Sequence, residues 1–192
     1  MDRGDLRDAL FAAAVVRGRS GSLRALVRGW TVDTAPVLAE PVACAAAARL
    51  MADFVRDLPV DLVTGIERAG GPLATKMAEV LGGDRPTDCR ATTWPKRKSA
   101  RSTENRESIE AATRAGSSTI IVDDIVNSGR TVRRVIGQVE SLGARVVAVV
   151  CLVKYSPNRP PLLRSWRGPV HAVYSLEDLG LRRFGVMTSP LG

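Results

Sequence analysis

The chain has 192 residues, enough for one domain with a sizeable hydrophobic core, and its apolar content of 45% is that of a globular protein. No apolar run approaches the roughly 18 residues that a membrane-spanning helix needs, so we expect no membrane segment. The formal net charge of +8 favours polyanionic partners, either small phosphorylated ligands or nucleic acid. Aromatic residues make up only 4% of the chain, which leaves few side chains to stack on bases. Small phosphorylated ligands are therefore the first expectation, and nucleic acid is the second.

The cysteines and the N-terminus indicate a cellular compartment. Cys44, Cys89 and Cys151 are isolated from one another and odd in number, which is typical of reduced thiols rather than of a disulfide framework or a zinc site. The first ten residues carry mixed charge, unlike a secretory signal peptide. We therefore expect a cytoplasmic protein.

The N-terminal third predicts two helices. One spans residues 2–17, and the other begins at Pro41 and runs to about residue 57. Glycines at 18–21 break the chain between them, and short strand pieces are expected around Trp30. The first helix has Leu6, Leu10, Phe11, Ala14 and Val15 on one face; the second carries Val42, Ala45, Ala46, Arg49, Leu50 and Phe54, and its small residues suit close packing on a sheet.

The middle of the chain alternates between strands and helices. Residues 60–65 form a short predicted strand, and a glycine-rich loop covers 65–71. A helix is expected from Pro72 to Gly82-Gly83, followed by a strand at 87–94. Residues 95–116 are charged and poor in apolar side chains, which is typical of a functional or disordered loop.

The last third continues this alternation. Apolar residues at 119–122 predict a buried strand, and a helix is expected at 132–142. A nearly continuous β-branched run predicts a strand at 145–153 that is buried on both faces. A further strand at 170–174 and a short capped helix at 175–178 follow. Such an order predicts an α/β fold with a parallel sheet, and its ligand site at the carboxyl ends of the strands.

The most informative stretch is Ser118 to Val132. A buried strand runs into two acids, Asp123 and Asp124, and then into a small-polar loop at 127–131 that opens a helix. Backbone N–H groups and the helix dipole make such a junction a site for an anion. Two carboxylates beside it suggest a ligand with hydroxyl groups, or a metal, as well as a phosphate. A sugar phosphate meets both demands.

This stretch, IIVDDIVNSGRT, resembles the ribose-phosphate signature of the type I phosphoribosyltransferase family. The glycine loop GIERAGGPLA, the charged loop and the ending VHAVYSLEDL resemble its orotate branch. The resemblance implies a central, mainly parallel sheet flanked by helices, with a small hood from the terminal segments. It implies one domain over 1–192, with a core at about 36–156 and a hood from about 1–35 and 157–192.

The implied activity is pentosyl transfer from phosphoribosyl pyrophosphate (PRPP) to a nitrogenous acceptor, with release of pyrophosphate and Mg²⁺ as cofactor, in nucleotide (pyrimidine) biosynthesis and in a homodimer. The acids Asp123 and Asp124 would be catalytic and would hold the ribose hydroxyls, directly or through Mg²⁺. The 5-phosphate would bind Asn127, Ser128, Gly129, Arg130 and Thr131. Pyrophosphate would bind Glu67, Arg68, Ala69, Gly70 and Gly71, covered by Arg90, Lys96 and Lys98.

Three alternatives stay open for the acceptor and the activity. The family's orotate enzymes have a lysine after the arginine assigned to Arg90 and a Lys-x-His-Gly element in the mobile loop; here Ala91 follows, and residues 95–110 contain no histidine. Glu67-Arg68 resembles the purine-type enzymes. An orotate-like acceptor is therefore our first expectation, a purine or a specialised-metabolism acceptor the second, and a non-catalytic regulator that binds nucleic acid the third.

Three further side chains could have a functional role, but a structural role is considered for each. His171, the only histidine, lies in an apolar strand and is expected to be structural. Cys151 in the core strand is expected to serve packing. Trp94 either stacks on a base or anchors the loop that follows it.

Overall fold

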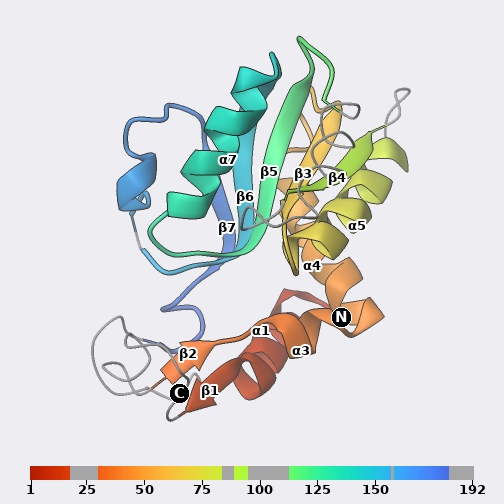
Figure 1. Cartoon of the computed structure of the whole chain (residues 1–192). Helices are drawn as coiled ribbons and strands as arrows, with labels where there is room; N and C mark the ends of the chain where they lie inside the picture. The colour runs from red at the N-terminus through yellow and green to blue at the C-terminus, as the bar shows by residue number, and fades with distance from the viewer. Residues whose placement is uncertain (18–29, 84–88, 95–112, 157, 182–192) are drawn as a thin grey trace, which may run out of the picture.

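The computed structural model describes residues 1–17, 30–83, 89–94, 113–156 and 158–181. Within these ranges, none of the helices is long and apolar enough to cross a membrane. The core is a five-stranded sheet of β3 (Leu62–Ile66), β4 (Arg90–Trp94), β5 (Ser118–Val126), β6 (Arg145–Lys154) and β7 (Val170–Ser175), with helices on both faces (Figure 1).

All five strands run parallel, in the order β4-β3-β5-β6-β7. β5 lies in the middle, so the sheet covers both of its edges, and its apolar run is buried on both faces. The carboxyl ends of β3, β4 and β5 meet at one edge of the sheet. The predicted α/β class and parallel sheet are confirmed.

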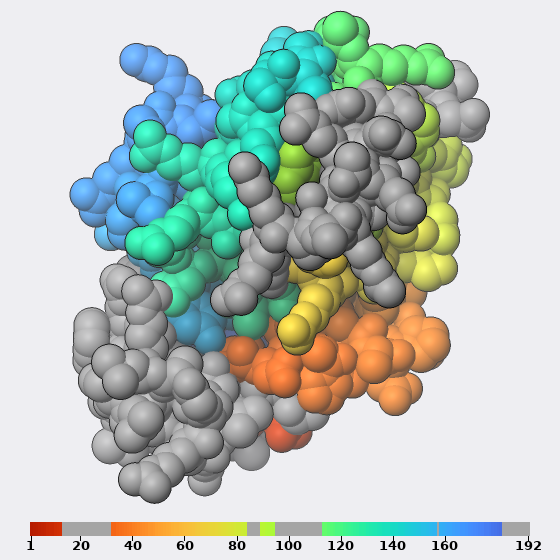
Figure 2. Space-filling model, viewed as in Figure 1, coloured from red at the N-terminus to blue at the C-terminus, as the bar shows by residue number. Residues whose placement is uncertain are grey.

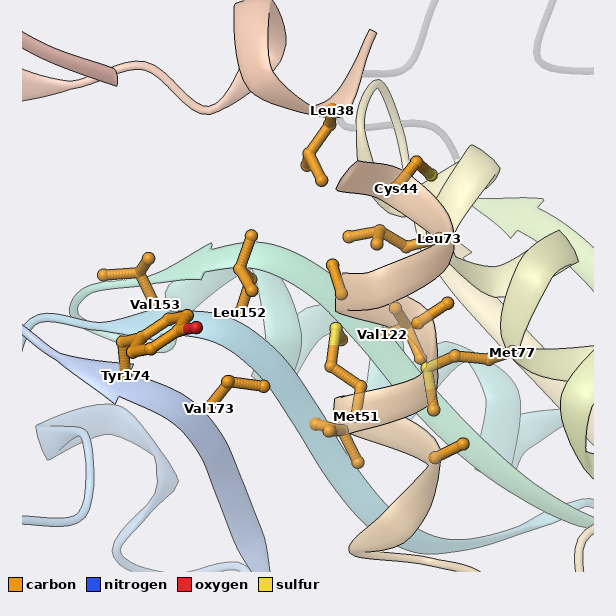
Figure 3. Close-up of a cluster of buried hydrophobic side chains, with 14 of the residues drawn as sticks. Leu38, Cys44, Met51, Leu73, Met77, Val122, Leu152, Val153, Val173 and Tyr174 are labelled. Carbon is orange, nitrogen blue, oxygen red and sulfur yellow. The ribbon is translucent and has the colours of Figure 1, made fainter. Parts of the chain in front are cut away.

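Two hydrophobic layers enclose this sheet. α4 (Pro41–Asp53) and α5 (Gly70–Gly83) cover one face, where small residues of α4 and the methionines Met51 and Met77 pack on alternate strand residues such as Val122 and Leu152 (Figure 3). α7 (Arg130–Ser141) covers the other face and packs on the strand residues between them. Buried side chains that follow one another in a strand thus mostly belong to opposite layers, although Leu152 and Val153 both join the layer of α4 and α5.

A smaller N-terminal layer lies beneath the carboxyl edge of the sheet (Figure 1). Its elements are α1 (Arg3–Ala9), a π-helical turn (Leu10–Ala14), β1 (Val15–Arg17), β2 (Trp30–Val32) and α3 (Ala35–Leu38). The Arg3 guanidinium donates to the carbonyl oxygen of Val173 in β7 over 2.8 Å, and the Tyr174 hydroxyl donates back to the Arg3 carbonyl. These bonds attach the start of the chain to the edge strand.

Some predicted boundaries differ from the structure. The first helix ends at residue 14, because Val15–Arg17 pair antiparallel with Trp30–Val32, a long-range contact that outweighs local helix spacing. The second helix ends at Asp53, and Val42 on it is 63% exposed rather than packed. α5 begins two residues before Pro72.

The C-terminal part also differs. The segment predicted as a capped helix, 175–178, is a turn in which the Ser175 hydroxyl donates to the Asp178 carboxylate over 2.8 Å. β7 pairs in register with β6, so the segment 157–192, assigned to the hood, contributes a strand to the core. The core therefore extends beyond residue 156. Residues 182–192, the end of the predicted hood segment, lie outside the described residues.

Candidate functional site

The two acids lie at the carboxyl end of the central strand. β5 continues through them to Val126, four residues beyond the predicted apolar strand. Asp123 is 3% exposed and pairs in register with Cys151, whereas Asp124 is half-buried. The Asp124 backbone N–H donates to Asp123 Oδ1 over 3.0 Å. Because successive side chains of a strand alternate, the two carboxylates serve two different pockets.

The smaller pocket, of about 120 Å³, has the size for a phosphate group. It is lined by Asp123 and by every residue from Ile125 to Val132. Gly129 has φ of 79° and precedes the first residue of α7, which turns the loop into the helix N-terminus. The predicted phosphate residues are therefore brought together in one concave loop, where helix N–H groups favour an anion.

A second segment braces this loop from outside. The Leu162 N–H donates to the Ser128 carbonyl over 3.1 Å, and a Cβ at Gly129 would lie 2.7 Å from Leu163 Cγ. The Arg159 guanidinium holds the segment together by donating to the carbonyls of Trp166 over 2.7 Å and Gly168 over 2.9 Å. The phosphate loop is thus fixed by residues about thirty positions further along the chain.

The glycine-rich loop after β3 forms the facing wall. A Cβ at Gly65 would lie 2.1 Å from the Gly70 carbonyl oxygen, and one at Gly70 would lie 2.9 Å from the Val122 carbonyl oxygen. These glycines let the start of α5 approach β3 and β5 closely. The Glu67–Arg68 peptide bond is cis, and the Glu67 N–H donates to the Trp94 carbonyl over 2.8 Å.

The larger pocket, of about 840 Å³, opens between this loop and the N-terminal layer. In Figure 2 the orange segment that holds α3 and α4 lies directly beneath the yellow segment that leads into α5. Three carboxylates and one guanidinium among the described residues line the pocket, which suits a polar ligand. The lining residues are Asp33, Ala35, Leu38, Ala39, Glu67, Arg68, Ala69, Pro72 and Asp124.

One predicted pyrophosphate contact lies away from this pocket, and two others fall outside the described residues. Arg90 is the first residue of β4 and pairs with Leu62, at the amino edge of the sheet. It lies four residues, roughly 13 Å of strand, from the carboxyl end at Trp94. The strand predicted at 87–94 is β4, and Arg90 stands at its start rather than at its carboxyl end. Lys96 and Lys98 lie outside the described residues.

Sequence patterns missed the contribution of the N-terminal layer. Thr34 is 1% exposed, and its hydroxyl donates to Asp124 Oδ2 over 2.5 Å. The nearby Asp33 carboxylate accepts from the Ala35 N–H over 3.1 Å and lines the larger pocket. The polar pair after a short strand and before Pro36 was a signal for this site, but nothing local connects it to Asp124.

The side chains expected to be structural lie in packed surroundings. Cys151 is fully buried, and burial raises the pKa of its thiol well above the ordinary value. His171 stacks on Phe54 with ring centroids 5.1 Å apart, and burial, followed by the charge of Lys154, lowers its pKa. Trp94 is buried with Ile66 in the α7-side layer, as an anchor would be.

The site has the ligands for a magnesium ion that a substrate shares, but not for a metal held by protein alone. No group of three or more histidine, cysteine or acidic side chains within the described ranges could hold a metal. Mg²⁺ commonly takes one or two carboxylates and completes its shell with water and substrate phosphates. Asp123 and Asp124, beside both pockets, fit that mode.

An acidic pair between a phosphate-sized loop and a glycine-walled pocket, on a parallel α/β sheet, is an arrangement that suits a sugar phosphate. The model of the phosphoribosyl transferase domain family matches residues 34–174. The chain belongs to this family, as the resemblance of the stretch IIVDDIVNSGRT had indicated. The match begins at Thr34 and ends within β7.

Relatives of known activity support this assignment. The chain is 34% identical over 157 residues to the adenine phosphoribosyltransferase of Cutibacterium acnes, covering 75% of this chain and 85% of the relative. It is 26% identical over 180 residues to the orotate phosphoribosyltransferase of Mycobacterium tuberculosis, covering 94% and 97%. A third relative, the transcriptional regulator GfcR 2 of Methanosarcina barkeri, is 36% identical over 94 residues, covering 49% and 45%.

Solved structures share the fold. The M. tuberculosis orotate phosphoribosyltransferase in complex with PRPP superposes with a TM-score of 0.71 at 21% identity, covering 93% of this chain and 99% of that one. The adenine phosphoribosyltransferase of Rhodothermus marinus superposes with a TM-score of 0.67 at 20% identity, covering 90% and 99%. The predicted type I phosphoribosyltransferase fold is confirmed.

Proposed function

We propose that this chain transfers the 5-phosphoribosyl group from PRPP to a nitrogenous heterocycle and releases pyrophosphate. The observation that carries the proposal is the position of the acidic pair, with Asp123 on the 120 Å³ phosphate loop and Asp124 on the 840 Å³ pocket. PRPP has a 5-phosphate, vicinal ribose hydroxyls and a pyrophosphate in this same sequence along the molecule. The site offers a partner for each group in that order.

The proposed roles follow from charge and geometry. The loop of residues 127–131 binds the 5-phosphate, and the two carboxylates hold the ribose hydroxyls and Mg²⁺. In the reaction the bond between ribose C1 and pyrophosphate oxygen breaks, a bond from C1 to the acceptor nitrogen forms, and that nitrogen loses a proton. Backbone N–H groups at 68–71 and the Arg68 guanidinium stabilise the leaving pyrophosphate, and Mg²⁺ when bound neutralises part of its charge.

An orotate-like heterocycle is our first acceptor. Relatives with orotate activity align over nearly the whole chain, including the N-terminal layer that lines the larger pocket. Arg68 is the guanidinium on that pocket wall and can pair with an acceptor carboxylate. Adenine is the second acceptor, because the adenine enzyme has the higher identity and because Asp33 and Glu67 can accept from an exocyclic amine.

A pyrophosphate-release assay tests the proposal directly. Purified protein, Mg²⁺ and PRPP are combined with orotate, adenine, other purines and aromatic carboxylates in turn. We expect release with one class of heterocycle, and a nucleotide product that mass spectrometry identifies. The proposal fails if no acceptor gives release and PRPP does not bind.

A regulator is the second candidate function, and the similarity to GfcR 2 favours it. A regulator would bind PRPP without turnover and would bind DNA or RNA with strong salt dependence. Binding of PRPP without release in the assay, together with such nucleic-acid binding, would select it.

Two finer properties belong to the proposal. A homodimer follows from the family resemblance, in which a partner's loop can cover the pyrophosphate. A cytoplasmic location follows from the isolated cysteines, which are free in the described structure. Sedimentation of the purified protein tests the dimer, and fractionation of cells that produce it tests the location.

A further inference from the structure

Residues 32–34 of the N-terminal layer are bonded to the ends of β6 and β5, through a hydroxyl in one case and an acid in the other. The Val32 N–H donates to the Tyr155 hydroxyl at the end of β6 over 3.3 Å. Two residues later, the Thr34 hydroxyl donates to Asp124 Oδ2 over 2.5 Å. Both Val32 and Thr34 are buried, so both donors are largely shielded from water. The two contacts therefore form a natural comparison.

We propose that Thr34 is a positioning residue that sets the orientation of the Asp124 carboxylate for the ribose of PRPP. This inference rests on the proposed function and adds a residue to its site. Thr34 stands just before α3, yet its side chain does not cap that helix. A threonine at such a position usually bonds to helix N–H groups. Here the hydroxyl is turned to the carboxylate instead.

The bond restricts a group that would otherwise rotate. Asp124 is half-buried at the wall of an 840 Å³ pocket, and its carboxylate could adopt several orientations there. A charge-assisted bond of this length fixes one oxygen and thereby the plane of the carboxylate. The Asp124 backbone N–H is itself bonded to Asp123 Oδ1, so the backbone and the side chain are both held. An acid held this way meets ribose hydroxyls or Mg²⁺ without first losing rotational freedom.

The same bond links the acceptor side to the donor side. The larger pocket is lined by Ala35, Leu38 and Ala39, which lie in the segment just after Thr34. A shift of this segment therefore changes the orientation of Asp124. Thr34 couples the wall that meets the acceptor to the carboxylate that meets the sugar.

The test measures binding by titration calorimetry in the absence of acceptor, with three probes. PRPP with Mg²⁺ and ribose 5-phosphate both carry ribose hydroxyls, whereas inorganic phosphate carries none. Thr34→Val keeps the shape and removes the hydroxyl. We expect it to weaken PRPP and ribose 5-phosphate binding by roughly ten- to a hundredfold, the range for a bond to a charged group, and to leave phosphate binding unchanged. Thr34→Ser should restore most of the affinity.

Tyr155→Phe is the matched control, because it removes the hydroxyl that accepts from the Val32 N–H and leaves the Thr34 hydroxyl on Asp124. We expect its affinity for PRPP to stay within about twofold of the parent chain. Equal losses in Tyr155→Phe and Thr34→Val would show that attachment of the segment matters and not the carboxylate, and would overturn the inference. Unchanged PRPP binding in Thr34→Val would also overturn it.

Two further outcomes concern the folding of the variant and the binding of PRPP by the parent chain. Should Thr34→Val fail to fold, Thr34→Ala removes the hydroxyl without placing a second methyl against the carboxylate and replaces it in the test. Absence of PRPP binding in the parent chain would overturn the proposed function, and this inference with it. Binding by the parent chain that Thr34 variants do not alter would overturn the inference alone.

Discussion

The two pockets that meet at the acidic pair are built in different ways. The phosphate pocket is lined by Asp123 and by the consecutive residues Ile125 to Val132, and a second segment packs against it from outside. The larger pocket takes its walls from residues 33–39, 67–72 and Asp124, which are far apart in the sequence. One pocket is thus local and braced, and the other is assembled from separate parts.

This difference separates donor recognition from acceptor recognition. A phosphate needs the same N–H groups in every enzyme that binds it, so a local loop can serve all of them. An acceptor differs from enzyme to enzyme, and a wall made of separate segments can change in one part while the others stay. The residues of the small pocket therefore carry the family resemblance. The relatives are named for different acceptors, adenine in one case and orotate in the other.

The strongest test removes the charge that both pockets share. Asp123→Asn together with Asp124→Asn keeps the size of both side chains and removes both negative charges. We expect loss of turnover by about a thousandfold or more, because the sugar and Mg²⁺ lose their ligands. PRPP affinity should fall as well, measured by calorimetry with and without Mg²⁺.

The single variants sharpen this comparison. If the carboxylates serve different pockets, Asp123→Asn should weaken the binding of inorganic phosphate differently from Asp124→Asn. Survival of both turnover and PRPP binding in the double variant would show that the site has been assigned to the wrong residues.

A smaller effect is expected from the brace of the phosphate loop. Gly129→Ala places a Cβ at φ of 79° and 2.7 Å from Leu163 Cγ. The left-handed backbone and the overpacking together should cost roughly 2 kcal/mol or more of unfolding free energy. Because the strain lies in the loop itself, the KM for PRPP should rise by about tenfold. Denaturant unfolding and steady-state kinetics measure the two effects.

Gly116 provides the matched control. It has φ of 82°, but a Cβ there would meet no atom within 4 Å. Gly116→Ala should therefore cost only the backbone part, about 1 kcal/mol, with no change in KM. Equal losses in the two variants would mean that Leu163 does not brace the loop. If it does, Gly129→Ala with Leu163→Ala should lose less stability than the sum of the two single variants.

The parts of the fold that could be predicted are those with local causes. The β-branched run predicted as a strand at 145–153 is β6, Arg145–Lys154, because burial on both faces leaves a continuous apolar pattern. The phosphate loop could also be predicted from local sequence, since its residues are consecutive. Gly129 alone identifies the turn into α7.

The parts that could not be predicted depend on long-range contacts. Thr34 and Asp124 are 90 positions apart, and neither one's neighbours indicate the other. The end of the first helix depends on pairing with Trp30–Val32, and the site of Arg90 depends on the register of β4 with β3. When a strand is predicted without its register to the neighbouring strand, a given side chain can be assigned to the amino or to the carboxyl edge of the sheet.

The smallest effect should come from a residue outside both pockets. His171 lies on the edge strand β7, separated from β5 by β6, and stacks on Phe54. Burial, with the charge of Lys154, lowers its pKa below the ordinary 6.5, so the folded chain resists protonation. Its contribution to stability is therefore complete above pH 6.5 and falls as the pH drops through that value, because only the unfolded chain then takes up the proton readily.

As the chain contains no other histidine, His171→Gln isolates this effect. We expect the parent chain to lose slightly more stability than His171→Gln between pH 7.5 and 5.5, a difference of about a degree in Tm because the ring is partly exposed. The KM for PRPP should be the same in both at each pH, since neither pocket contains the ring. A change in that KM would mean that the acidic edge responds to β7, and that the contrast between a braced donor site and an assembled acceptor site extends further into the sheet.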